Sequence, residues 1–256
     1  IYQNDDAGLQ LNIGGRGLDP NRTSNFNTRQ NGYDISADVL GYPESYYTPP
    51  AEGLEEIQII RGAASLQYGT QFGGLINFKL KRPDPIKPFT FITRNTLGSN
   101  NLLTNFSMAS GTLDKFRYIG FVNLKKGDGF RPNSNFNSSN VFVQIGYDFS
   151  EDTFVTAEVT YLDYLAQQAG GLSDIMFDEN PYQSNRSRNW FALSWILYNI
   201  KFQHSFNTDS NLSLNLFGLD AQRNAIGFRS NRVSQIDPKL ERDLIKGGFN
   251  NYGIEL

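Results

Sequence analysis

The chain has 256 residues and a formal net charge of -3, which argues against a broad basic surface for nucleic acid. It contains no cysteine, so disulfides and thiolate metal sites are excluded. The longest apolar run, near Trp190 to Tyr198, is far shorter than the roughly 20 residues that a membrane-spanning helix needs. Phenylalanine, tyrosine, asparagine, glycine and serine are abundant, which favours many strands joined by polar turns.

The first motif lies near the start of the chain. Leu9, Leu11 and Ile13 alternate with polar residues and lead into the string Gly14-Gly15-Arg16-Gly17. Alternation of this kind predicts a strand. A polar, loop-like stretch follows from Pro20 to Arg29.

A second and longer motif runs from Glu52 to Pro83. Ile57 and Ile59 alternate with polar residues up to Arg61-Gly62, and a second alternating segment starts at Leu75. Both segments predict strands. Between them, Gly69, Gly73 and Gly74 mark places where the backbone turns sharply or lies against another backbone.

These two motifs resemble the plug domain of TonB-dependent outer-membrane transporters. In that family an acidic, apolar strand is followed by Arg-Gly, a small-residue run ending in Tyr-Gly, then Gly-Gly, Asn and a basic exit. The matching positions are Arg61, Gly62, Ser65, Tyr68, Gly69, Gly73, Gly74, Asn77, Lys81, Arg82 and Pro83. The upstream Gly15-Arg16-Gly17 resembles the family's first Arg-Gly strand, and Asn31-Gly32-Tyr33 resembles its Asp-Gly-Val turn. The run from Gly17 to Phe26 is most similar to the ferric citrate type. The motifs cover residues 1 to 83.

From Pro88 onward the pattern changes to repeated strands of about 10 residues, the length that a tilted bilayer-crossing strand requires. The predicted strands are Phe89–Leu97, Leu102–Ser110, Phe116–Lys126, Asn140–Phe149, Thr153–Leu165, Trp190–Phe206, Leu212–Ala225 and Phe249–Leu256. We expect them to form one curved antiparallel sheet, because hairpin turns link them.

The connections between these strands alternate in length. Short turns at 111–115, 150–152 and 207–211 alternate with long loops at 127–139, 166–189 and 226–248, apart from a short first connection. This alternation is typical of an outer-membrane barrel. In the last long loop, Asp237 and Pro238 predict the start of a small helix.

The predicted fold is therefore mainly β, with a plug-domain fragment inside part of a large antiparallel transmembrane barrel. We assign residues 1–87 to the C-terminal part of the plug and residues 88–256 to about the first eight barrel strands. Eight strands alone would close a barrel too small for a plug, whereas the family uses about 22. We therefore expect an incomplete chain that lacks the N-terminal coupling segment and the remaining strands.

Alternation also predicts which side chains face which way. In the fourth predicted strand, Val141, Val143, Ile145 and Tyr147 share one side and are expected to face lipid, with Gln144 and Asp148 on the other side. A soluble sandwich would show the same alternation.

The resemblance implies transport and not catalysis. His204 is the only histidine, and the paired carboxylates lie in turns, so we expect no catalytic residue, no metal site and no cofactor. The implied ligand is a ferric chelate such as ferric citrate. The implied partners are a TonB-type inner-membrane energy-coupling protein and outer-membrane lipid. Another cargo (a glycan, haem or cobalamin) and a structural or docking role in a larger envelope complex remain alternatives.

An anionic chelate would be held by guanidinium groups and neutral amides or hydroxyls. The predicted plug contacts are Arg22, Thr23, Asn25 and Gln71. Further cations on predicted apical or outer loops are Arg29, Arg131, Arg186, Arg188, Arg229 and Arg232. The two plug loops, Pro20–Arg29 and Ala37–Pro50, either face the ligand or pack against the barrel wall.

The last expectation concerns how the plug is held. In the resembling family, the two Arg-Gly arginines pair with barrel glutamates, and these positions match Arg16 and Arg61. By alternation, Glu158 and Glu255 should point into the lumen. We expect one or both glutamates to contribute to this plug-barrel lock, unless they are simply hydrated.

Overall fold

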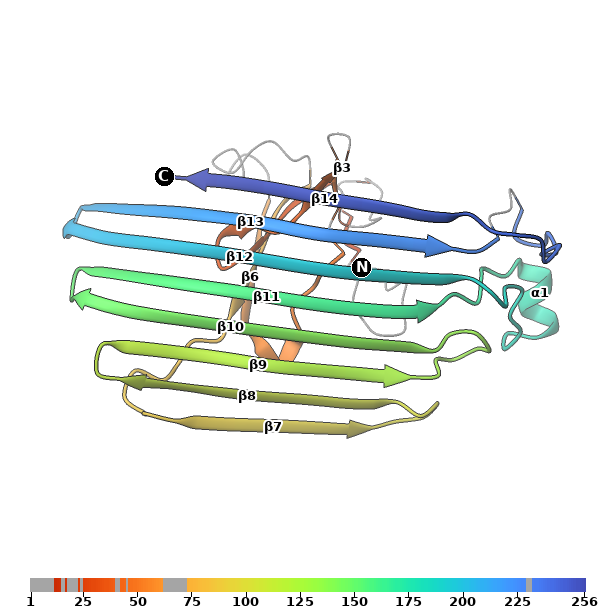
Figure 1. The fold of residues 1–256 in the computed structure, drawn as a ribbon, viewed down its shortest axis with the longest axis horizontal. Coiled ribbons are helices and arrows are strands. Elements are labelled where there is room, and N and C mark those ends of the chain that lie inside the picture. The colour runs from red at the N-terminus through yellow and green to blue at the C-terminus, as the bar shows by residue number, and fades with distance from the viewer. Residues whose placement is uncertain are drawn as a thin grey trace.

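The computed structural model describes residues 12–14, 17, 23, 25–39, 42–44, 46–61, 73–228 and 232–256. These residues form two sheets that face one another and a separate small hairpin (Figure 1). Arg16, Arg22 and Gln71, together with the strand predicted at Leu9 and Leu11, lie outside the described residues.

The small sheet has four strands in the order β2-β1-β6-β5. Its strands are β1 (Phe26–Gln30), β2 (Tyr33–Asp34), β5 (Leu54–Ile60) and β6 (Gly74–Leu80). β1 pairs with β6 in parallel, and β5 pairs with β6 antiparallel. The motif glycine Gly74 has a φ of +117°, and a Cβ there would collide with the carbonyl oxygen of Ile60. Glycine is therefore required where β6 begins beside the end of β5.

The segment between β2 and β5 carries the remaining local structure of this part. The hairpin of β3 (Ala37–Val39) and β4 (Tyr42–Glu44) is followed by a short 3-10 turn over Ala51–Gly53.

The large sheet has eight antiparallel strands in sequence order, from β7 at one edge to β14 at the other. Its strands are β7 (Thr90–Leu97), β8 (Leu103–Leu113), β9 (Phe116–Gly127), β10 (Phe136–Ser150), β11 (Thr153–Gln167), β12 (Trp190–Asn207), β13 (Ser210–Ile226) and β14 (Leu244–Glu255). The prediction of one antiparallel sheet is confirmed. Several strands extend further toward the long loops than the sequence indicated, as β10 and β14 show.

The two ends of the large sheet differ in their connections. Turns at 114–115, 151–152 and 208–209 join strands at what we call the short-turn end, and loops at 128–135, 168–189 and 227–243 lie at the long-loop end. The one α-helix among the described residues is α1 (Asp174–Glu179), capped by the side chain of Ser173. No helix in the described part of the chain is long and apolar enough to cross a membrane.

The helix predicted after Asp237 is wrong. The loop there is irregular, and Lys239 has a left-handed φ of 58°, which a helix does not allow. The Asp237 carboxylate accepts a hydrogen bond from the Lys239 amide in a local turn at 2.8 Å.

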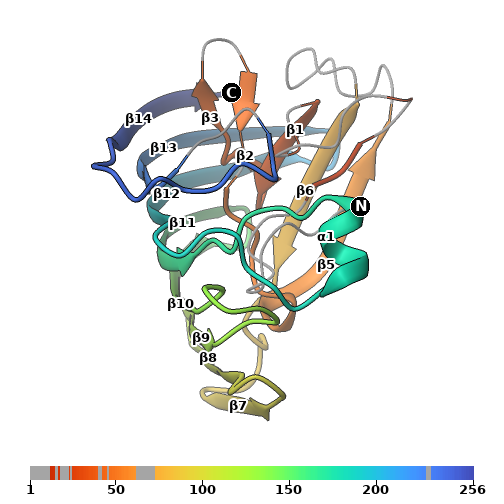
Figure 2. The same cartoon turned by 90° about the vertical axis from the view of Figure 1, so that its right-hand side faces the viewer.

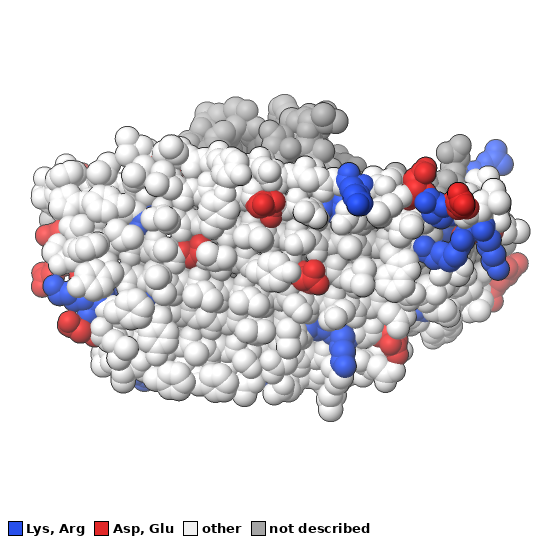
Figure 3. Space-filling view, in the orientation of Figure 1, with Lys and Arg blue, Asp and Glu red and all other residues white. Residues whose placement is uncertain are grey.

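Side chains of the large sheet alternate between the small sheet and the outside. Val143, Ile145 and Tyr147 are about half exposed on the outer face, whereas Gln144 points inward and bonds Glu158. Figure 3 shows that this outer face is a broad band with few charged side chains, and that lysines and arginines gather at the long-loop end. The predicted alternation of β10 is therefore confirmed.

The inner face of the large sheet packs against the small sheet, and the large sheet curves around it (Figure 2). One apolar cluster contains side chains from both sheets. Tyr46 contacts the rings of Phe191 and Trp195, and Phe26, Ile76 and Phe78 belong to the same cluster. This shared core fixes the small sheet on the inner face of β10 to β13.

Candidate functional site

The polar contact between the two sheets is centred on Glu158 of β11, whose side chain is 4% exposed. Its carboxylate accepts hydrogen bonds from Asn31 Nδ2 at 2.8 Å, Gln30 Nε2 at 3.2 Å and Gln144 Nε2 at 2.6 Å. Two of these donors come from the small sheet and one from the large sheet. Burial of a carboxylate is tolerated when several donors bond it, and here those donors also join the sheets.

Asn31 occupies the tight turn between β1 and β2, with a left-handed φ of 49°. Its amide oxygen accepts a hydrogen bond from the backbone of Leu80 at 3.0 Å, while its amide nitrogen donates to Glu158. One side chain therefore joins β6 to the large sheet. Asparagine tolerates the left-handed conformation better than most residues, so it suits both the turn and the contact.

A second polar contact joins Arg29 of β1 to Glu255 of β14. The guanidinium group donates from both terminal nitrogens to the two carboxylate oxygens, at 2.8 and 2.5 Å. Arg29 Nε also donates to Asn27 Oδ1 at 2.8 Å, which fixes the orientation of the group. The arginine side chain is 3% exposed and the glutamate side chain 31% exposed. A bidentate arginine–carboxylate pair of this kind fixes the relative orientation of its two side chains.

A half-buried carboxylate lies next to this pair. Asp34 of β2 accepts a hydrogen bond from the backbone of Ser36 at 2.8 Å and stands opposite Arg29 in the strand register. Burial raises the pKa of Asp34 above its usual range, although the Ser36 hydrogen bonds and the charge of Arg29 oppose this shift.

The contacts between the sheets thus involve partly different residues from those expected for a lock. Glu158 and Glu255 both face the small sheet, but their partners come from β1 and the turn after it. Arg61 is exposed and makes no hydrogen bond or ion pair with any described residue, so the expected pairing of Arg61 with either glutamate is corrected. The strand order explains this, because Arg61 follows β5, at the edge of the small sheet opposite β2.

Sequence reasoning missed the roles of Arg29, Gln30 and Asn31. The signal in the sequence was the run of polar residues from Asn27 to Gln30. The structure shows that the strand β1, which contains this run, is fully buried. Such residues need partners, and only the structure shows that the partners lie on β11 and β14.

Two of the predicted ligand contacts lie in the described part. Thr23 is buried, and Asn25 is half-buried with its backbone carbonyl accepting a hydrogen bond from Gly73 at 2.7 Å. Because Arg22 and Gln71 are outside the described residues, the grouping of all four remains a prediction.

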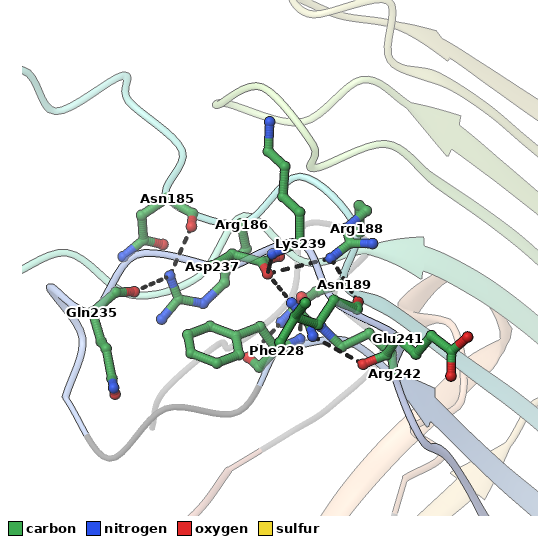
Figure 4. A network of polar contacts seen from close by, with 11 residues as sticks. Asn185, Arg186, Arg188, Asn189, Phe228, Gln235, Asp237, Lys239, Glu241 and Arg242 are labelled. Atoms are coloured by element: carbon green, nitrogen blue, oxygen red, sulfur yellow. Dashed lines mark hydrogen bonds and ion pairs between the residues drawn. The ribbon is translucent and has the colours of Figure 1, made fainter.

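The loop arginines serve mainly to join the long loops to one another. Arg131 donates to the backbone carbonyls of Gln183 and Gly170. Arg186, which is buried, donates to the carbonyls of Asn185 and Gln235 at 2.7 and 3.0 Å (Figure 4). Arg232 is exposed, and Arg229 is outside the described residues. Most of the described loop arginines are thus already engaged by the protein.

Asp237 gathers two more guanidinium groups in the same region. Its Oδ1 accepts hydrogen bonds from Arg188, at 3.3 Å, and from Arg242 (Figure 4). Arg186 and Arg242 both lie over the ring of Phe228, with their guanidinium carbons 5.0 and 5.1 Å from its centroid. We call this group, formed by Arg186, Arg188, Phe228, Asp237 and Arg242, the loop cluster. It joins the loop at 168–189 to the loop at 227–243.

No protein-family model matches the chain. The chain is similar in structure to the unliganded ferric citrate transporter FecA, with a TM-score of 0.77, 22% identity and coverage of 99% of this chain and 39% of FecA. It is also similar to the ferric-catecholate import receptor Fiu of E. coli K12, with a TM-score of 0.68, 12% identity and coverage of 94% and 39% of the two chains. A third similar structure is the copper transporter OprC, with a TM-score of 0.64, 16% identity and coverage of 90% and 34%.

The chain spans about two fifths of the length of FecA and Fiu, and about one third of OprC. The match to FecA takes in nearly all of this chain, including both sheets. This chain therefore has the fold of the TonB-dependent outer-membrane receptors.

Proposed function

We propose that this chain belongs to an energy-coupled transporter of the bacterial outer membrane that imports a ferric chelate such as ferric citrate. The observation that carries the proposal is the small sheet held inside the curved large sheet by polar contacts at Glu158 and Glu255. The outer face of the large sheet is apolar and suits lipid. We assign the small sheet to the plug and the large sheet to the barrel wall, with the domain boundary near residue 87.

In this proposal the long-loop end faces the exterior and the short-turn end faces the periplasm, because outer-membrane barrels have long external loops and short periplasmic turns. The cargo enters between the long loops, and a TonB-type partner supplies the energy that displaces the plug. The protein performs transport and no chemical conversion of the cargo.

The choice of ferric citrate rests on two observations. The similar structure of highest TM-score among those described above is a ferric citrate transporter. Thr23 and Asn25 lie in the run that resembles the ferric citrate type, and Arg22 lies between Asn21 and Thr23 in the same run. A small polycarboxylate chelate is anionic, so it suits a site with guanidinium, hydroxyl and amide donors.

The test is binding of ferric citrate to the full-length protein in detergent, measured by calorimetry. A ferric catecholate, a copper salt, haem and cobalamin serve as competing cargoes, since similar folds include a catecholate receptor and a copper transporter. Binding of ferric citrate with weaker binding of the others supports the proposal. Tight binding of another cargo alone would replace ferric citrate as the substrate.

The alternative of a docking subunit predicts a different result. Deletion of the gene would leave growth under iron limitation unchanged, and the protein would co-purify with envelope partners in fixed stoichiometry. Loss of growth on ferric citrate as the iron source would exclude this alternative.

A further inference from the structure

A cavity of about 520 Å³ lies between the small sheet and the inner face of β9 to β12. It begins at the Glu158 contact and continues toward the short-turn end, where Phe154 and Gln203 line it. Its lining contains five basic residues, Lys79, Lys81, Arg82, Arg117 and Lys201, and one acidic residue, Glu158.

Most of these charges already have partners. Lys79 pairs with Glu56 at 2.8 Å, and Lys81 donates to the backbone carbonyl of Glu52 at 2.6 Å. Arg117 pairs with Asp148 on the neighbouring strand. The one acidic side chain, Glu158, is occupied by the three amide donors described above. The lining itself therefore carries an excess of positive charge, with five basic residues against the single carboxylate of Glu158.

Lys201 is one of these basic residues. It is half-buried on the inner face of β12, and it makes no hydrogen bond or ion pair with any described residue. A half-buried ammonium group without a partner favours an anion within reach.

Asn199 supplies a second, independent observation. It lies two residues before Lys201 on the same face, lines the same cavity and is 3% exposed, yet its amide oxygen has no hydrogen-bond partner in the described structure. Buried amides are normally bonded, and an amide oxygen accepts a hydrogen bond, so a free one suits a donor such as a hydroxyl group of a bound molecule. An ammonium group and a free amide oxygen on one wall therefore form a binding surface for a hydroxy acid, whose carboxylates meet the ammonium and whose hydroxyl donates to the amide oxygen.

We infer that this cavity is an anion-binding site on the short-turn side of the Glu158 contact, and that it takes small polycarboxylates. Lys201 provides the charge, Asn199 provides a hydrogen bond, and Gln203 lies at the next inward position. The inference rests on the proposed function for its role, which is to hold the anionic cargo after it passes the plug-wall contact. The site itself is separate from the predicted contacts at Arg22, Thr23, Asn25 and Gln71.

The site can be tested without transport by chemical protection. An amine-reactive acylating reagent is applied to the full-length protein in detergent, and the labelling rate of each lysine is measured by mass spectrometry. Citrate alone, without iron, should slow the labelling of Lys201 by about tenfold, as a bound anion engages the amine. Lys126, which is exposed on the outer face of β9, is the matched control and should keep its rate. Glycerol, a neutral probe, should protect neither lysine.

An unchanged rate at Lys201 in citrate would overturn the inference. So would complete failure of Lys201 to react in the absence of citrate, because the cavity would then be closed to small solutes. The substitution Asn199→Leu should abolish most of the protection, and persistence of full protection in this variant would remove Asn199 from the site.

A transport assay separates this inference from the proposed function. In cells, Lys201→Met should lower the maximal rate of ferric citrate uptake by about tenfold while binding of ferric citrate to the cell surface stays unchanged, and Lys126→Met should change neither. Protection of Lys201 by citrate without any uptake of ferric citrate would support the anion site but reject ferric citrate as the cargo. Uptake that is normal in Lys201→Met, together with unprotected labelling, would reject the site alone.

Discussion

The contact at Glu158 and the loop cluster at Asp237 both gather hydrogen-bond donors around one carboxylate, but with different donors. Glu158 is bonded by neutral amides and joins two sheets, whereas Asp237 is bonded by two guanidinium groups and joins two loops. The two carboxylates are similarly buried, with Glu158 4% and the Asp237 side chain 7% exposed, but Arg188 in the loop cluster keeps 41% of its side chain exposed. The contact at Glu158 therefore depends on hydrogen bonds from neutral groups, and the loop cluster on charge that solvent screens at Arg188.

The largest expected effect comes from removing the central carboxylate. Glu158→Ala removes the carboxylate acceptor of the half-buried amides of Asn31 and Gln144 and one of three acceptors of Gln30, so the free energy of unfolding should fall by about 3 kcal/mol. Denaturant unfolding of the full-length protein, followed by tryptophan fluorescence, measures this change, since Trp195 lies in the shared core. Asp163→Ala, an exposed carboxylate on the same strand, should change it by less than about 0.5 kcal/mol. Equal effects of the two substitutions would contradict the special role of Glu158.

The next largest effect is expected at the ion pair. Arg29→Met should lower the free energy of unfolding by about 2 kcal/mol, less than a fully buried pair would give, because Glu255 is partly exposed. Arg61→Met is the control, since Arg61 has no partner among the described residues. A double-mutant cycle with Glu255→Gln isolates the pair, and a coupling free energy near zero would show that the pair does not hold the sheets together.

A smaller and local effect is expected in the loop cluster. Asp237→Asn removes the charge that Arg188 and Arg242 share, and should cost about 1 kcal/mol of local stability. Hydrogen exchange of the loop residues after Val233 should become faster, while exchange in β11 and β12 stays unchanged. Glu241→Gln, a neighbouring exposed acid, should have no such effect. Slower exchange of the loop in Asp237→Asn would contradict this account.

The smallest effect concerns pH. The pKa of Asp34 is raised by burial, so the folded protein binds this proton more tightly than the unfolded chain does. The contribution of Asp34 to the stability of the small sheet should therefore be fully present below the unfolded pKa of about 3.9 and be lost as pH rises through the folded pKa. Asp34→Asn should flatten this dependence in unfolding measured across that range. A wild-type stability that rises with pH in step with Asp34 titration would show that the Arg29 charge outweighs burial.

The large sheet could be predicted well from the sequence because its pattern is local. Alternating residues such as Val143 and Ile145 mark each strand, and short polar turns fix the pairing of neighbours. The strand ends were less accurate: β10 begins at Phe136 and not at Asn140, because pairing continues with β11 beyond the apolar segment.

The contacts of the small sheet could not be predicted in the same way. Whether Arg29 or Arg61 meets a glutamate of the large sheet depends on the strand order, and in particular on the parallel pairing of β1 with β6. That pairing joins segments about 50 residues apart and leaves no signal in alternation. The short helix α1 was missed because six residues carry too little periodicity.

The apolar cluster shared by the two sheets has a thermal consequence. Moving the small sheet away from the wall would expose Tyr46, Phe78 and Trp195 to water, and exposure of apolar surface raises the heat capacity. Apolar attraction weakens on cooling, whereas the amide bonds at Glu158 do not depend on temperature in this way. The free energy needed to separate the sheets should therefore depend on temperature in a non-linear way. At low temperature, the polar contacts of Glu158 and Arg29 should contribute more to this free energy than the aromatic core does.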